Sequence, residues 1–63
     1  MIVAHLIVDG EEKEQREVPD EWLHMAAAAH WPVLINGVRY TMLKVEHCVI
    51  GGAPHALVDL CPS

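Results

Sequence analysis

Histidine and cysteine side chains are the first residues in this sequence that could do chemistry. Four of them, His47, Cys48, His55 and Cys61, fall in one C-terminal stretch, and both residue types ligate zinc. Within this stretch neither of the common finger spacings, C-x2-C and H-x3–5-H, occurs. His47 and Cys48 are also neighbours on a predicted strand, so their side chains point to opposite faces. We therefore predict no metal site and no cofactor, and interpret both cysteines as small apolar residues of the last strands. A metal-stabilised structural module and a Cys48–Cys61 disulfide are the alternatives.

Catalytic nucleophiles are scarce in the chain. The only threonine is Thr41 and the only serine is Ser63. The adjacent His47 and Cys48 lack the shared face that a thiol–imidazole dyad needs. The carboxylates between positions 11 and 17 lie in a charged segment that implies no cleft, whereas acid–base catalysis needs a perturbed pKa. The sequence therefore predicts a protein that is not an enzyme.

A small nucleotide is the ligand class for which suitable side chains are present. Arg39, Tyr40 and Lys44 could hold a phosphate and stack on a base. No phosphate-binding glycine motif accompanies them, since Gly51-Gly52 is typical of a turn. Arg39 and Tyr40 point to opposite faces of a strand, and so small a chain has little room for a pocket. An oligomer that sequesters a nucleotide signal, with its pocket between subunits, is therefore the alternative function.

Negative charge is concentrated in one segment. The chain has a formal net charge of −5, and seven of its nine acidic residues lie between positions 9 and 21, with Lys13 and Arg16 among them. This segment alone accounts for the whole net charge. The simplest interpretation is a solvated turn and strand, and the functional one is an acidic surface that docks on a basic protein. The same charge disfavours direct nucleic-acid binding. The acidic residues assigned to partner binding are Glu11, Glu12, Glu14, Glu17 and Asp20.

Two tryptophans bracket a predicted helix. Trp22 and Trp31 lie nine positions apart, which places them on opposite sides of a helix with 3.6 residues per turn. One core cannot readily bury both, so one is expected inside and the other exposed or in an interface. Because exposed tryptophan often dominates binding energy, we assign both to the predicted partner-binding surface.

The elements that position these residues are expected in the order β-β-α-β-β-β, within one domain spanning residues 1–63. Residues 1–8 are apolar on both faces, which indicates a central strand or one whose second face meets another chain. Asp9-Gly10 and Asn36-Gly37 are hairpin signals, and residues 12–18 are expected to form a polar edge strand. A helix is predicted at about residues 19–31, ending before Pro32.

The expected fold class is α+β: a strongly bent antiparallel sheet or small open barrel, covered by the helix. Helical spacing predicts a buried face formed by Trp22, Met25, Ala26 and Ala29. In the long strand expected over residues 38–50, the apolar alternation changes phase between Met42 and Val45. A β-bulge at this point would bend the strand as a small barrel requires.

Self-association is predicted from the size of the chain. With 63 residues and 52% hydrophobic content, it has more apolar surface than so small a domain readily buries. The first strand and the alanines at 26–29 are the expected contact surfaces of a homodimer. No apolar run is long enough to cross a membrane, no secretory signal is present, and two cysteines fit a reducing compartment. We therefore expect a cytoplasmic protein with no membrane partner.

Two hairpin segments of this chain resemble short phage-encoded accessory proteins with an SH3-like barrel. The resemblance lies in Asp9-Gly10-Glu11-Glu12 through Pro19-Asp20 and in Ile35-Asn36-Gly37-Val38-Arg39-Tyr40 through His47. The chain departs from the pattern at residues 20–31, where a helix replaces a short connection. The resemblance implies a viral or mobile-element setting and supplies no functional residue. Together with the charge and the missing catalytic motifs, it predicts a non-enzymatic inhibitor or adaptor that docks on a host defence protein.

Overall fold

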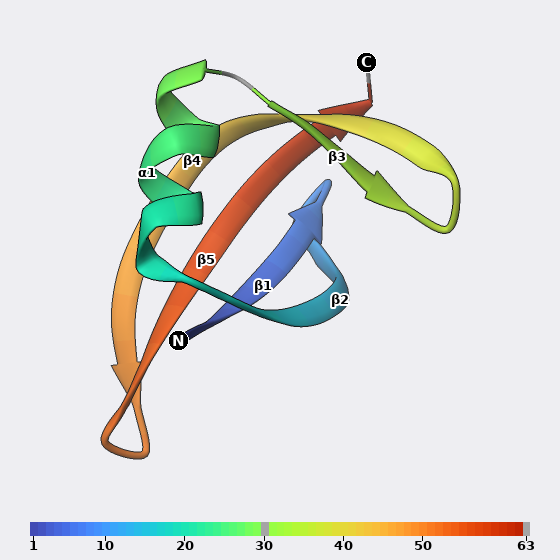
Figure 1. Cartoon of the computed structure of the whole chain (residues 1–63). Helices are drawn as coiled ribbons and strands as arrows, with labels where there is room; N and C mark the ends of the chain where they lie inside the picture. Colours follow the sequence, from blue (N-terminus) through green and yellow to red (C-terminus); the bar gives the residue numbers. More distant parts are fainter. Residues whose placement is uncertain (30, 63) are drawn as a thin grey trace.

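The computed structural model describes residues 1–29 and 31–62, and within this range the side chains of Ala26 and Ala27 are not described. The elements are β1 (Ile2–Val8), β2 (Glu11–Val18), α1 (Asp20–Ala29), β3 (Pro32–Ile35), β4 (Val38–Ile50) and β5 (Ala53–Pro62). The five strands form one curled sheet in the order β2-β1-β5-β4-β3, and α1 lies beside β4 (Figure 1). The order of elements and the strongly bent sheet with one helix are confirmed. The helix is shorter than predicted, and most of the chain is strand.

The sheet is mixed, so the prediction of a purely antiparallel sheet is wrong. β1 and β5 pair in parallel, with Val3 opposite His55 and Val8 opposite Leu60. A tight turn forces antiparallel pairing only on the two strands it connects. β1 and β5 are joined by no such turn, so the local hairpin signals carry no information about their relative direction.

Short two-residue turns connect β1 to β2 and β3 to β4. Asp9 and Gly10 have φ values of 52° and 77°, and Asn36 and Gly37 have values of 50° and 79°. Positive φ at both central residues is the geometry of the two-residue hairpin turn that matches strand twist. The predicted β1–β2 and β3–β4 hairpins are therefore confirmed.

A β-bulge shifts the pairing of β4 with β5 between Met42 and Lys44, as the change of phase predicted. The extra residue is Leu43, which is exposed. Because a shift of one residue reverses the side chains of a strand, the bulge returns Val45 to the face that carries Met42. β4 therefore contributes to the core on both sides of the bulge.

The core lies on the inner face of the sheet, which we define as the face carrying these buried side chains. Its members are apolar residues from all the elements: Ile2, Ala4, Leu6, Val8, Val18, Leu23, Val33, Ile35, Met42, Ala56, Val58 and Leu60. Trp22, Tyr40 and Val45 are half-buried and pack against it. β1 is paired on both edges and contributes four core residues. It is therefore a central strand, which is the first of the two interpretations of its apolar sequence.

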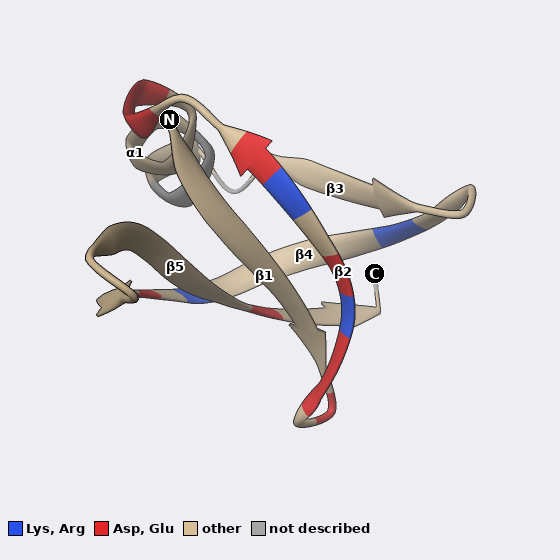
Figure 2. Cartoon of the chain, turned by 90° about the horizontal axis from the view of Figure 1, so that it is seen from below, with Lys and Arg blue, Asp and Glu red and all other residues tan. Residues whose placement is uncertain are grey.

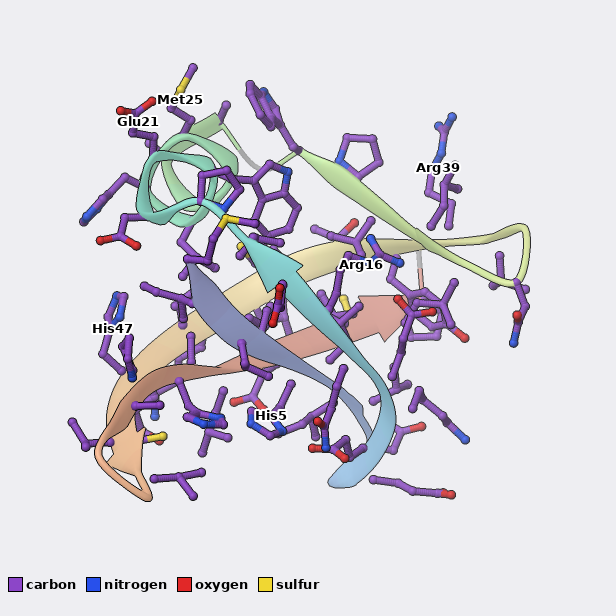
Figure 3. The ribbon with its side chains drawn as sticks, turned by 60° about the horizontal axis from the view of Figure 1, so that its bottom comes forward. His5, Arg16, Glu21, Met25, Arg39 and His47 are labelled. Carbon is purple, nitrogen blue, oxygen red and sulfur yellow. The ribbon has the colours of Figure 1, made fainter. Side chains whose placement is uncertain are left out.

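The buried face of α1 differs from the predicted one. Leu23 is 1% exposed and Trp22 packs against the core, whereas Met25 is 54% exposed and Ala29 is exposed. Figure 3 shows Met25 and Glu21 on the side of α1 that points away from the sheet. The helix therefore meets the core through the side that carries Leu23, and half-buried Trp22 packs against the same core. Ala26, also assigned to this face, lies outside the described side chains, and His30 lies outside the described residues.

The barrel is open along one seam, between the edge strands β2 and β3. Arg16 on β2 spans this seam: its Nη2 donates to the Leu34 carbonyl oxygen of β3 at 3.0 Å. Its Nε donates to Glu14 Oε2 at 2.7 Å, and the same two side chains form an ion pair. A side chain bridges the two edges here, as seen around Arg16 in Figure 3. The observed fold is thus a half-barrel, in agreement with the open form of the prediction.

Candidate functional site

The outer face of the sheet, opposite the core, carries polar side chains from four strands. Strand register fixes which residues share this face, because residues directly opposite each other point the same way. Three rows cross β2, β1, β5 and β4 in that order: Glu17–Val3–His55–Cys48, Gln15–His5–Leu57–Glu46 and Glu12–Ile7–Asp59–Lys44. α1 packs on the opposite, core face through Leu23, so no helix of the described chain covers the outer face, and exposed side chains such as Glu12 and Glu46 are available to other molecules.

Four of these side chains form one hydrogen-bonded network across three strands. His5 on β1 is the centre: its Nδ1 contacts Glu12 Oε1 on β2, and its Nε2 lies 2.7 Å from His55 Nδ1 on β5. Gln15 Nε2 donates to the second oxygen of Glu12 at 3.1 Å. His5 is only 8% exposed and is the one buried polar residue among those described. We call Gln15, Glu12, His5 and His55 the histidine network.

The ionised carboxylate of Glu12 fixes the direction of one hydrogen bond in the histidine network. An ionised carboxylate can only accept, so Nδ1 of His5 carries a hydrogen directed at Glu12. In the neutral ring, Nε2 of His5 then has a lone pair and accepts from Nδ1–H of His55. With both rings neutral, this arrangement sets the tautomer of His5 and leaves Nε2 of His55 without a hydrogen.

The pKa of Glu12 is lowered from its ordinary value of 4.5. The first cause is the hydrogen bond from Gln15, followed by the hydrogen bond and charge interaction with His5. Both partners stabilise the charged form of the carboxylate. Glu12 is therefore ionised at neutral pH, as the assigned hydrogen positions require.

A second pair of histidines lies elsewhere on the molecule. The rings of His24 on α1 and His47 on β4 have centroids 6.3 Å apart and planes inclined by 31°. Both residues are exposed, and neither ring has a carboxylate partner among the described hydrogen bonds and ion pairs. The His24–His47 pair therefore lacks, among the described residues, the carboxylate contact that His5 makes with Glu12.

The acidic residues assigned from the sequence lie along β2, an edge strand, and at the start of α1 (Figure 2). They do not form one uniform surface. Glu12 belongs to the histidine network, Glu14 pairs with Arg16, and Glu11 lies 3.5 Å from Lys13. Glu17 and Asp20 are exposed and form no ion pair with the described residues. The predicted polar edge strand is confirmed.

The two tryptophans have different environments, as expected. Trp22 is half-buried against the core, and Trp31 is 38% exposed just before β3. Leu34 of β3, which is 57% exposed, accepts the hydrogen bond from Arg16 across the seam. Exposed apolar residues on the β3 side therefore lie across the seam from the acidic strand.

The three residues proposed for a nucleotide are not brought together. Arg39 lies opposite Leu34 on the outer face, and Tyr40 is half-buried against the core on the inner face. Lys44 is on the outer face and lies 3.7 Å from Glu46. The described part of one chain also contains no pocket. A nucleotide site between subunits stays a prediction.

Both cysteines are free thiols, so the alternative of a Cys48–Cys61 disulfide is wrong. Register separates them, because Cys48 lies opposite His55 and Cys61 opposite Thr41. Within residues 1–29 and 31–62, no group of three or more His, Cys, Asp or Glu side chains is placed to hold one metal ion. No helix of the described chain is long and apolar enough to cross a membrane.

Sequence reasoning missed His5 and His55 as a pair. Fifty positions separate them, and only the parallel pairing of β1 with β5 brings them together. The available signal was His5 itself, a polar residue in an otherwise apolar strand, which required a partner when buried. The identity of that partner depends on a register that no local pattern specifies.

Comparison with models of known protein families, with curated proteins and with solved structures finds no match to this chain.

Proposed function

We propose that this chain is a non-enzymatic binding protein that docks on a basic surface of another protein through β2 and the adjoining seam. The observation that supports this most directly is the position of the acidic segment on an exposed edge strand. Charge at the rim of an interface mainly accelerates encounter and selects partners, and residues 9–21, which contain β2, carry the chain's whole net charge of −5.

Apolar residues on the opposite side of the seam complete the proposed surface. Trp31 and Leu34 are exposed, and Arg16 links β2 to Leu34 directly. Binding energy in protein interfaces is concentrated in a few aromatic and apolar residues surrounded by polar ones. In this proposal Trp31 supplies the binding energy and β2 supplies steering. The resemblance to phage accessory proteins makes a host protein the proposed partner and inhibition the proposed outcome.

The test is affinity capture from a host-cell lysate, followed by binding measurements with the purified partner. Glu17→Lys reverses a charge on β2, and we expect binding at least tenfold weaker, about 1.4 kcal/mol or more. Trp31→Ala should weaken binding by a similar or larger factor. Affinity for the unchanged chain should fall with rising salt, because exposed charges are screened.

The matched control is Glu46→Lys, the same charge reversal on the outer face of β4, away from the seam. It should change affinity by about twofold at most, as expected outside an interface. Equal effects of Glu17→Lys and Glu46→Lys would show a nonspecific charge response and contradict the proposed surface. A bound nucleotide in place of a protein would favour the alternative function.

A further inference from the structure

We propose that His5 and His55 form a two-histidine site for a divalent transition-metal ion, held between Nε2 of His5 and Nδ1 of His55. This inference does not depend on the proposed function and shares with it only Glu12 and Gln15 of β2. It rests on the direct approach of two ring nitrogens from different strands, 2.7 Å apart, with a carboxylate behind one of them.

The two rings meet edge to edge at these nitrogens. Their planes are inclined by 23°, and their centroids are 5.0 Å apart, which exceeds the nitrogen–nitrogen distance by about one ring width. Such rings do not overlap face to face. Zn–N bonds of about 2.0–2.1 Å at a tetrahedral angle separate the nitrogens by roughly 3.4 Å, so the rings must part by about 0.7 Å and turn until both lone pairs point at the ion. The half-buried side chain of His55 is the one with room to move.

Glu12 has the position that a carboxylate takes behind a metal-bound histidine. Histidine ligands usually donate their second ring N–H to a carboxylate, which fixes the tautomer and raises ligand basicity. Here Glu12 accepts from Nδ1 of His5, and Gln15 holds Glu12 in turn. In its neutral form His5 then presents the lone pair of Nε2 that a metal requires.

Metal binding moves one hydrogen within the site. His55 must carry its hydrogen on Nε2 instead of Nδ1, so that the lone pair of Nδ1 is free for the ion. The neutral pair has two ring hydrogens before binding and two afterwards, and no net proton is released. Imidazole nitrogens suit Zn²⁺, Ni²⁺ and Cu²⁺, whereas Mg²⁺ prefers oxygen. Because two side chains supply only part of a coordination shell, water or another donor fills the remaining positions.

The experiment is titration of the full chain with ZnCl2 and NiCl2, followed by calorimetry and by nitrogen NMR of the histidine rings. We expect one ion per chain and a change of the His55 tautomer from Nδ1–H to Nε2–H, with no binding of MgCl2. This NMR readout needs no substitution and therefore does not depend on a variant that folds. Retention of Nδ1–H on His55 at saturating zinc would overturn the site.

Substitutions then locate the ion. His55→Gln should abolish binding, and Glu12→Gln should weaken it about 10- to 100-fold, the usual effect of removing such a carboxylate. His24→Gln is the matched control, since it removes a ring from the other histidine pair, where no carboxylate is in contact. Loss of binding in His24→Gln with retention in His55→Gln would refute the assignment.

Discussion

At the scale of single residues, the histidine network makes the stability of the fold at acidic pH depend on the carboxylate of Glu12. Glu12 has a lowered pKa in the folded chain, so its ionised form stabilises the fold. That contribution is fully present above the ordinary value of 4.5 and is lost as pH falls through the lower folded value. We expect Glu12→Gln to be less stable than the unchanged chain at neutral pH. The difference should shrink below pH 4.5, as measured by urea unfolding across a pH series.

Glu46→Gln controls for the loss of one negative charge from the outer face, since the ion pair that Glu46 forms with the described residues is with Lys44, at 3.7 Å. A stability difference for Glu12→Gln that stays constant from pH 7 to pH 3 would contradict the role of the network.

At the scale of elements, Leu23 is the one fully buried side chain among those described in α1. Leu23 is 1% exposed, whereas Met25 points away from the sheet. Leu23→Ala leaves a cavity beneath the helix and should cost about 3 kcal/mol of the free energy of unfolding. Met25→Ala removes a similar number of atoms from an exposed position and should change it by less than about 0.5 kcal/mol. Comparable losses from both substitutions, measured by urea unfolding, would favour the helix orientation predicted from the sequence.

The elements also show how far local sequence determines this fold. The hairpin at Asn36-Gly37 and the bulge before Lys44 were predictable, because turn geometry and alternation are properties of adjacent residues. The orientation of α1 was not, because Leu23 and Met25 are both apolar and only the sheet selects between them. The parallel β1–β5 pair, and with it the approach of His5 to His55, depends on contacts between the two ends of the chain.

At the scale of the whole molecule, the described surface leaves one side of α1 apolar. Met25, Ala28 and Ala29 are exposed and occupy positions that share a helical face. We expect this face to form the contact of a two-fold homodimer, in which each helix packs against its copy. Ala28→Arg should then give particles of 7.0 kDa in light scattering at micromolar concentration, where the unchanged chain has twice this mass.

Glu46→Arg places a similar side chain on β4, away from α1, and should leave the dimer intact. A single 7.0 kDa particle for the unchanged chain would contradict the dimer and leave the apolar side of α1 for a different protein. Contact through the edges of β1 is already excluded, since both are paired within the sheet.

The position of β5 has a consequence for how the chain reaches this structure during synthesis. β5 is translated after the other four strands, yet it lies in the middle of the sheet between β1 and β4. Before it emerges from the ribosome, the β1–β2 and β3–β4 hairpins have no strand between them, and isolated hairpins are at best marginally stable. The core can therefore assemble only once β5 is free, which makes folding of this domain a step that follows its translation.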